Sequence, residues 1–255
     1  MKIVISKTAD ELGCRAAEQS ARVIKEAIAK NGKARIVLST GASQFETLKY
    51  LVKADVDWSK VEMFHLDEYV DLPITHPASF RKYLKERFVD LTNVGAAHFV
   101  DGTPEGIEAL TKELRSAPID LGLIGIGRNS HIAFNDPPAD FDTKVAYLVV
   151  KLDDACRDQQ VGEGWFATRD DVPKYAVSMS VWQIMQCKTI ISAVPHAEKA
   201  WAVAAALGSE LTNRVPATML KTHGDYTLYV DAASYADVKN VVSLKGETDI
   251  EDHRA

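Results

Sequence analysis

Short apolar segments alternate with amphipathic segments along most of this sequence, and this alternation constrains the fold more than any other feature. Residues 2–6 and 34–38 have the length and composition of buried strands, whereas residues 8–30 carry apolar side chains at helical spacing. Strands that alternate with helices form parallel sheets whose two faces are covered by the helices. We therefore predict an α/β fold.

The length and composition of the chain predict a single domain. Its 255 residues, of which 46% are hydrophobic, suffice for one large α/β domain with a well-buried core. We assign residues 1–245 to this domain and residues 246–255 to a polar C-terminal tail. The remaining strands are predicted at residues 61–66, 98–100, 121–126, 145–152, 175–179, 189–194 and 226–230, and the remaining helices at residues 44–53, 79–88, 104–116, 181–187 and 197–207, with a short helix after the last strand.

Charge and cysteine usage argue against several classes of protein. The formal net charge of -6 and the absence of a Lys/Arg cluster argue against nucleic-acid binding. No apolar run approaches the roughly 20 residues of a membrane helix, and the first residues do not resemble a signal peptide, so we expect a cytoplasmic protein that does not bind a membrane. Cys14, Cys156 and Cys187 form no C-x-x-C pair, which indicates neither a disulfide framework nor a zinc site. The sequence leaves open whether the chain forms a homo-oligomer.

The stretch DLGLIGIGRNSHIAFNDPP at residues 120–138 is the first candidate for a functional site. An apolar strand that contains glycines opens abruptly into polar residues, and α/β proteins bind ligands at the carboxyl ends of such strands. Gly125 and Gly127 let the backbone approach a bound molecule, while His131 and Asp136 form a proton-handling pair. The alternative is an ordinary loop histidine followed by a Pro-Pro stop.

An anion-binding turn is predicted after the strand at residues 34–38. Thr40, Gly41, Ala42 and Ser43 precede a helix, so free backbone N–H groups and the positive end of the helix dipole would point to one place. The lysine of a Walker A motif is missing, so the anion need not belong to a nucleotide. Thr40 or Ser43 could instead simply cap the helix.

Asp67 and Glu68 directly follow the strand at residues 61–66. Two adjacent carboxylates repel each other when both are buried and ionised, so we expect one to have a raised pKa and the other to face solvent or a cation. Together with His65 and His76 they could be imagined as metal ligands, but no fixed spacing such as H-E-x-x-H supports a metal site.

Lys199 and residues 157–171 are further candidates. A lysine near the amino end of a helix is unfavourable unless an anion pairs with it, although an exposed lysine is the usual case. Residues 157–171 are predicted to be irregular, either as a lid or as a loosely packed surface excursion. The G-x-G at residues 125–127 is followed too soon by Pro137 and Pro138 for a dinucleotide-binding helix, so we expect no NAD.

Five motifs in the same order resemble those of the glucosamine-6-phosphate deaminases, also called isomerases. They are LSTGAS (38–43), FHLDEYV (64–70), GIGRNSHIAFNDPP (125–138), AEKAWA (197–202) and VPATML (215–220). The similarity extends over nearly the whole chain and is that of a divergent member. It implies a Rossmann-like α/β fold, shared with the 6-phosphogluconolactonases, that uses no dissociable cofactor. It also implies conversion of D-glucosamine 6-phosphate and water into D-fructose 6-phosphate and ammonia.

The resemblance implies roles for individual residues. Asp67 would move a proton between C2 and C1 of the sugar, which one carboxylate can do because the two carbons are neighbours. His131 would assist ring opening, a task suited to an imidazole that titrates near neutrality. The expected catalytic set is Asp67, Asn129, His131 and Asp136, and the expected substrate-binding and phosphate-binding set is Thr40, Gly41, Ala42, Ser43, Glu68, Gly127 and Lys199, with no metal ion.

The histidine loop departs from the family pattern. That pattern has an aspartate two residues before the histidine and a glutamate five residues after it, where this chain has Asn129 and Asp136. An amide carries no charge, so only Asp136 is left to raise the basicity of His131.

A phosphate-binding arginine of the family has no clear counterpart at residues 162–166, where it is expected, and Arg157 or Arg169 could replace it. Two alternatives therefore remain beside the deaminase interpretation. One is a sugar-phosphate lactone hydrolase like the 6-phosphogluconolactonases, although these have T-A-S-L-F after the histidine where this chain has IAFN (132–135). The other is a sugar-phosphate-binding protein with altered catalysis.

Overall fold

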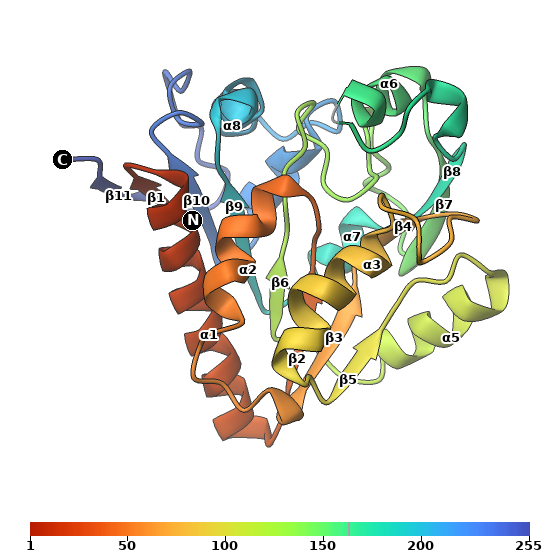
Figure 1. Cartoon of the computed structure of the whole chain (residues 1–255). Helices are drawn as coiled ribbons and strands as arrows, with labels where there is room; N and C mark the ends of the chain where they lie inside the picture. The colour runs from red at the N-terminus through yellow and green to blue at the C-terminus, as the bar shows by residue number, and fades with distance from the viewer. Residues whose placement is uncertain (163) are drawn as a thin grey trace.

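The central sheet of the computed structural model, which describes residues 1–162 and 164–255, consists of eight parallel strands (Figure 1). Their order is β11-β1-β10-β9-β6-β2-β3-β5, so the strands near the middle come from distant parts of the sequence. The expected mostly parallel sheet is confirmed. The strands are β1 (Lys2–Ser6), β2 (Ala34–Leu38), β3 (Val61–His65), β5 (Ala96–His98), β6 (Leu121–Leu123), β9 (Thr189–Val194), β10 (Tyr226–Asp231) and β11 (Asp249–His253).

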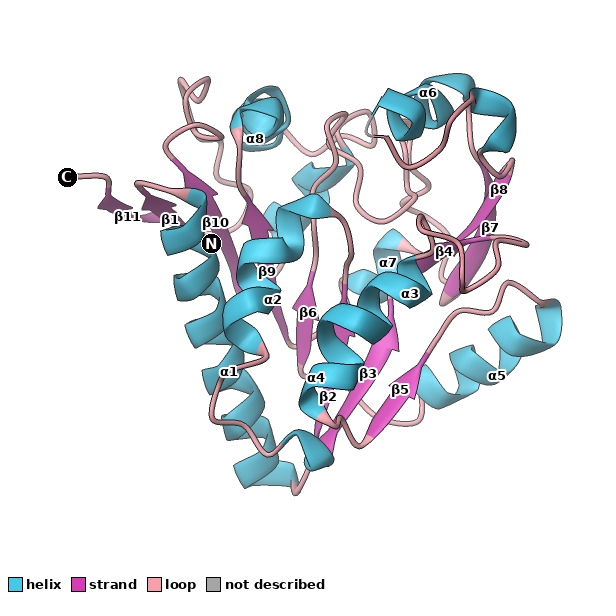
Figure 2. Cartoon of the chain, in the orientation of Figure 1, coloured by secondary structure: helices cyan, strands magenta, loops and turns pink. Residues whose placement is uncertain are grey.

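Helices cover both faces of this sheet, because neighbouring residues of each buried strand point to opposite faces. Val4 and Ile36 pack in the cluster on the face of α1, whereas Ile3 and Val37 pack in the cluster on the opposite face. Figure 2 shows the helices of the first face in front of the sheet. On that face lie α1 (Ala9–Asn31), α2 (Phe45–Leu51) and α3 (Phe80–Leu84), which continues through a π-helical turn (Lys85–Val89) into α4 (Asp90–Thr92), and on the other lie α5 (Pro104–Leu114), α7 (Val181–Ile184) and α8 (Ala200–Gly208).

The ends of α1 illustrate how the sequence sets these elements. Thr8 accepts a hydrogen bond from the N–H of Glu11 at 3.2 Å, which satisfies one of the free donors of the first turn. Gly32 adopts a φ of 78° and closes the last turn, a conformation that costs glycine little. Among the described residues, no helix is long and apolar enough to cross a membrane.

A second, three-stranded antiparallel sheet stands beyond the carboxyl ends of the large sheet. It has the order β4-β8-β7, with β4 (Asp67–Tyr69), β8 (Tyr175–Met179) and β7 (Tyr147–Lys151). The N–H of Met179 donates to the carbonyl oxygen of Leu66 at 2.9 Å, which joins this sheet to the end of β3. Helix α6 (Asp154–Gly162) lies above it in Figure 1.

Two expectations for the middle of the chain are wrong. Strand β6 ends at Leu123 rather than at residue 126, and the N–H of Gly125 donates instead to the Ser39 hydroxyl at 3.0 Å. The segment at residues 157–171 is not irregular throughout, because α6 occupies its first part. Residue 163, which belongs to the same expected segment, lies outside the described residues.

The C-terminal residues also differ from the expectation. The predicted polar tail at residues 246–255 contains β11, which pairs in parallel with β1 in the register Lys2 to Asp249 and Ser6 to His253. An ion pair of 2.6 Å between Lys2 and Glu251 accompanies this pairing. Because the strand is built from backbone hydrogen bonds at the edge of the sheet, it needs no alternation of apolar side chains. The short helix expected after β10 is wrong as well, because turns follow that strand.

Candidate active site

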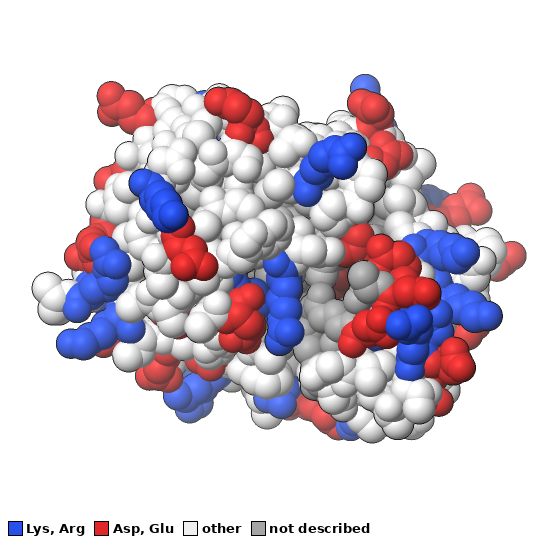
Figure 3. All heavy atoms as spheres, turned by 90° about the horizontal axis from the view of Figure 1, so that it is seen from above, with Lys and Arg blue, Asp and Glu red and all other residues white. Residues whose placement is uncertain are grey.

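A cavity of about 330 Å³ opens where the carboxyl ends of the large sheet meet the small sheet. Figure 3 shows this face of the molecule, which is hollowed near its middle and carries interspersed basic and acidic side chains. Most of the residues predicted for the site therefore come together from distant parts of the sequence. Those that line the cavity are Thr40, Gly41, Ala42, Ser43, Asp67, Gly127, His131 and Lys199.

His131, Asp136 and Asn129 form a hydrogen-bonded unit in the loop after β6. The Nδ1 atom of His131 lies 2.9 Å from Oδ1 of Asp136, so Nε2 is the ring nitrogen left for a bound molecule. Burial alone would raise the pKa of Asp136, but the His131 hydrogen bond and charge, with the Asn129 hydrogen bond, outweigh it and hold that pKa below its usual range. The aspartate is thus suited to orient His131 and to stabilise its protonated form.

Asn129 connects the two members of this pair without lining the cavity. Its amide nitrogen donates to Oδ1 of Asp136 at 2.8 Å, and its amide oxygen accepts from the N–H of His131 at 3.1 Å. Asn129, expected in the catalytic set, thus contacts His131 and Asp136 rather than the cavity. Asp136 likewise lies behind His131 rather than at the cavity wall.

Gly127 belongs to the site because it leaves room for the histidine ring. A Cβ atom at this position would lie 2.1 Å from Nε2 of His131 and 2.3 Å from Cε1, which is closer than any real contact. No larger residue fits beneath the ring unless His131 moves. The close approach predicted between this glycine and a bound molecule is, in the structure, an approach to the His131 ring.

Asp67 presents its carboxyl group to the cavity in a nearly dry setting. The residue is 6% exposed, and no donor in the described part of the chain hydrogen-bonds to its carboxylate. Burial, together with the charge of Glu68, raises the pKa of Asp67 to about 8. The expectation that one of the two adjacent carboxylates has a raised pKa is met by Asp67.

Glu68 is buried on the other side of β4 and does not line the cavity, which corrects its expected place in substrate binding. Its carboxylate accepts hydrogen bonds from the Ser79 hydroxyl at 2.8 Å and from the N–H groups of Phe80 and Arg81 at 3.2 and 2.8 Å. An ion pair of 3.4 Å to the Arg81 guanidinium supplies the expected cation. Glu68 therefore caps the amino end of α3.

The turn after β2 has the form expected of an anion seat. Gly41 adopts φ 98° and ψ 167°, a conformation reserved for glycine, and a short 3-10 turn (Ala42–Gln44) leads from it into α2. The hydroxyl of Tyr83 donates to the carbonyl oxygen of Gly41 at 2.9 Å, which fixes the turn from the side of α3. The N–H groups of Gln44 and Phe45 donate within the turn, to the carbonyl oxygens of Gly41 and Ala42, so an anion in the cavity would meet the N–H groups of Ala42 and Ser43.

Two cationic side chains line the cavity near this seat. Lys199 ends a 3-10 turn (Ala197–Lys199) that precedes α8, as expected for a lysine at the amino end of a helix. Arg128 also lines the cavity, although the sequence reasoning did not select it. The two arginines proposed as replacements, Arg157 and Arg169, are not among the described lining residues, because they pair with acidic residues of α6 such as Asp154.

The sequence reasoning missed the wall contributed by α6 and the residues that follow it. Gln160 and Trp165 line the cavity from this wall, and Phe80 and Phe134 line it nearby. Nothing in the local sequence distinguishes these side chains from core residues. Their position depends on the packing of α6 against the small sheet.

The histidines considered as metal ligands are accounted for by other contacts. His65 is fully buried, and burial together with the Arg81 charge lowers its pKa to about 3, so its ring is neutral. Its Nδ1 accepts from the N–H of Val100 at 3.4 Å. His76 stacks on Phe166 with ring centroids 5.1 Å apart.

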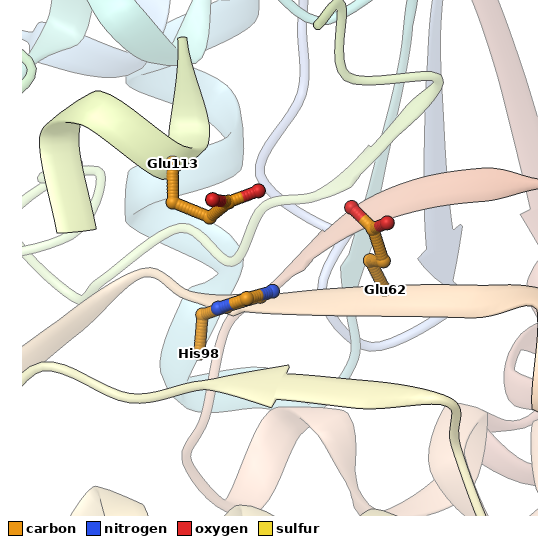
Figure 4. A group of neighbouring side chains, drawn as sticks. All are labelled: Glu62, His98 and Glu113. Atoms are coloured by element: carbon orange, nitrogen blue, oxygen red, sulfur yellow. The ribbon is translucent and has the colours of Figure 1, made fainter. Parts of the chain in front are cut away.

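Elsewhere in the described chain, Glu62, His98 and Glu113 bring ligand atoms within 4.8 Å of one another (Figure 4). Both oxygens of Glu62 already bind cations, namely Lys33 at 2.8 Å and Arg35 at 2.9 Å. These two positive charges balance the two carboxylates, so the group offers little net charge to a divalent cation.

Comparisons with known proteins give a consistent result. Residues 7–229 match the model of the family described as glucosamine-6-phosphate isomerases/6-phosphogluconolactonase. A glucosamine-6-phosphate deaminase of Streptococcus pneumoniae serotype 4 is 34% identical over 214 residues, which cover 82% of this chain and 90% of the relative. A glucosamine-6-phosphate deaminase of Streptococcus uberis is 32% identical over 243 residues, which cover 93% of this chain and all of the relative.

Solved structures of two kinds share the fold. A structure of a monomeric glucosamine-6-phosphate deaminase superposes with a TM-score of 0.83 at 28% identity, covering 93% of this chain and 100% of its own. A 6-phosphogluconolactonase-like protein of Neisseria gonorrhoeae superposes with a TM-score of 0.71 at 19% identity, covering 91% of this chain and 100% of its own, and this likeness concerns the fold alone.

Proposed function

Because this chain belongs to the family of glucosamine-6-phosphate isomerases and 6-phosphogluconolactonases, we propose that it converts D-glucosamine 6-phosphate and water into D-fructose 6-phosphate and ammonia. One observation carries the choice of this reaction within the family. Asp67 places a carboxyl group with a raised pKa in the same cavity as His131 and the predicted phosphate seat. Proton abstraction next to a carbonyl group needs such a base.

The first step is the opening of the sugar ring. His131, neutral in the free enzyme, takes the proton of the anomeric hydroxyl at Nε2 and passes a proton from Nε2 to the ring oxygen as the bond from C1 to the ring oxygen breaks. Asp136, at 2.9 Å from the other ring nitrogen, stabilises the charged imidazolium. The product is the open-chain aldehyde.

The second step is a proton transfer along the sugar chain by Asp67. The ionised carboxylate removes the proton from C2 while a proton of the ammonium group moves to the C1 oxygen, which gives an enolamine, and the resulting carboxylic acid returns the proton to C1. Water then adds to the iminium carbon at C2, and ammonia leaves. With a pKa raised to about 8, the carboxylate is a stronger base than an ordinary aspartate, and the ammonium group of the bound amino sugar favours its ionised form.

The phosphate group is proposed to lie between the turn after β2 and Lys199. The turn at residues 41–43 supplies N–H donors, and Lys199 supplies a charge. Arg128, on the cavity wall, stands in for the arginine that the family has elsewhere. Binding energy from the phosphate can then hold the sugar against Asp67 and His131.

The test is to incubate the purified protein with glucosamine 6-phosphate and to measure released ammonia and fructose 6-phosphate. Equal amounts of both products, absent with unphosphorylated glucosamine, are expected. A parallel incubation with 6-phosphogluconolactone measures acid release above the spontaneous rate. Lactone hydrolysis without ammonia release would replace the proposed reaction by the lactonase reaction, and binding of the sugar phosphate without either reaction would indicate a binding protein.

A further inference from the structure

Gln160 is a buried polar side chain of the cavity wall that has no part in the chemistry described so far. It lies in the last turn of α6 and is 8% exposed. The backbone N–H of Trp165 donates to the backbone carbonyl oxygen of Gln160 at 3.1 Å, so the chain folds back after α6. Both residues line the cavity.

A tyrosine fixes the direction of the Gln160 amide. The hydroxyl of Tyr69 donates to Oε1 of Gln160 at 2.7 Å. Tyr69 is 1% exposed, and its ring packs against Phe80, Phe134 and Phe166 with centroids 5.2, 5.2 and 5.5 Å away. Because the ring cannot turn without opening this aromatic cluster, the amide oxygen of Gln160 is held toward β4.

The amide nitrogen of Gln160 is therefore the group that meets the cavity. Across residues 1–162 and 164–255, no acceptor hydrogen-bonds to Nε2, although the side chain is buried. Because Gln160 lines the cavity, this pair of N–H groups can donate to the oxygen atom of a ligand bound there.

The location of Gln160 indicates which ligand oxygen it meets. Tyr69 lies two residues after Asp67, and in a strand such residues point to the same face, so the Gln160 amide belongs to the Asp67 side of the cavity. The phosphate seat and Lys199 belong to the large sheet on the other side. In the proposed reaction Asp67 works at C1 and C2, and His131 works at the ring oxygen. The hydroxyl groups on C3 and C4 remain.

We propose that the Gln160 amide donates a hydrogen bond to the C3 or C4 hydroxyl of the sugar phosphate, and that Tyr69 is the residue that positions it. Gln160 then selects substrates that carry a hydroxyl at that carbon, because the analogue without it leaves the buried amide unpaired. This inference rests on the proposed function for the identity of the sugar.

The experiment compares wild type with Gln160→Met, which keeps the length of the side chain but has no amide. Dissociation constants are measured by calorimetry for glucosamine 6-phosphate and for its 3-deoxy and 4-deoxy analogues, and inhibition constants for inorganic phosphate. Wild type should bind one deoxy analogue roughly threefold to tenfold more weakly than the parent sugar. Gln160→Met should bind the parent sugar with the same loss and should no longer distinguish that analogue.

Two further variants separate the lost donor from disturbed packing. Gln160→Glu keeps an acceptor for Tyr69 but loses the N–H donors, so it should lose the same discrimination. Tyr69→Phe keeps the Gln160 amide but removes the hydroxyl that holds it. Discrimination between the parent sugar and the deoxy analogue should therefore weaken, while inhibition by inorganic phosphate stays unchanged.

The inference is overturned if wild type binds both deoxy analogues as tightly as the parent sugar, if Gln160→Met retains the discrimination, or if its loss appears as weaker inhibition by inorganic phosphate. Ammonia release by wild type without Gln160-dependent discrimination would reject the inference and keep the proposed function. Discrimination in binding without ammonia release would support the inference and reject the proposed function.

Discussion

Asp67 and Glu68 are neighbours in strand β4 whose carboxylates have opposite environments. The Asp67 carboxylate opens into the cavity without a hydrogen-bond donor from the described residues, and its pKa is raised to about 8. The Glu68 carboxylate accepts hydrogen bonds from the start of α3 and pairs with Arg81. The alternation of side chains along a strand thus places one carboxylate at the cavity and the other against the start of α3.

Asp67→Asn should abolish ammonia release and leave binding of the sugar phosphate largely intact. The amide has the shape of the carboxylate but cannot take the proton from C2. A steady-state assay and a calorimetric titration measure the two properties. Turnover close to wild type would remove Asp67 from the proposed role.

The same substitution should make the folded protein more stable at high pH. A carboxyl group whose pKa is raised on folding contributes stability that is complete below its unfolded pKa near 3.8, and that is lost as the pH rises through about 8. The free energy of unfolding of Asp67→Asn minus that of wild type should therefore grow between pH 5 and pH 9, by an amount on the order of a few kcal/mol. Urea titrations at both pH values measure this difference. A difference that does not change with pH would show that ionisation of Asp67 does not destabilise the folded protein.

Lys199→Ala should raise KM for glucosamine 6-phosphate roughly tenfold to a hundredfold and change kcat much less. The phosphate contact is shared by the ground state and the transition state, so its loss weakens substrate binding rather than the chemical step. The loss of a hydrogen bond between charged groups weakens affinity by about tenfold to a hundredfold. Lys30→Ala, at the exposed last turn of α1, is the control for the loss of a positive charge. Equal activity of wild type on unphosphorylated glucosamine would contradict the phosphate seat itself.

Asn129→Asp should shift one part of the pH profile of kcat/KM. Below about pH 8, kcat/KM should fall in inverse proportion to the proton concentration, because Asp67 must be ionised. It should fall more steeply once His131 takes up its proton in the free enzyme. A carboxylate at position 129 stabilises the imidazolium, so this second break should move to higher pH. An unchanged profile with intact activity would mean that Asn129 only shapes the loop.

Gly127→Ala should reduce kcat by about a hundredfold, because the new Cβ would lie 2.1 Å from Nε2 of His131 and force the ring away. Gly162→Ala is the matched control, since no atom of the described residues lies within 4 Å of a Cβ atom there and its φ is not left-handed. Thermal melting curves of both variants distinguish a displaced ring from unfolding. Normal kcat in a folded Gly127→Ala protein would show that the ring position is not critical.

Sequence patterns predicted the large sheet better than its surroundings. Strands β1, β2 and β9 of the large sheet have the bounds expected from their apolar residues, because burial on both faces leaves a strong local signal. Helix α6 is largely polar and takes its place by packing against the small sheet, so the local sequence could not reveal it. Strand β11 depends in the same way on a partner 240 and more residues away.

The candidate site shows the same division. His131 and the turn at Gly41 stand in local motifs, and the sequence therefore predicted them. The capping of α3 by Glu68 depends on contacts with that helix, and the position of Gln160 depends on Tyr69. No local sequence pattern predicts either contact. The raised pKa of Asp67 could be predicted because its cause, Glu68, is the next residue.

The cavity is shared between two sheets, and this arrangement has a consequence for how such proteins diversify. The turn at Gly41 and Lys199, which are proposed to bind the phosphate, follow strands of the large sheet, whereas the wall that carries Asp67 and Gln160 belongs to the small sheet and α6. If the proposed function holds, substitutions in the second wall change which sugar is accepted while the residues that bind the phosphate group stay the same. The preference for one sugar can thus change through residues of the small sheet and α6, while residues that follow strands of the large sheet maintain phosphate binding.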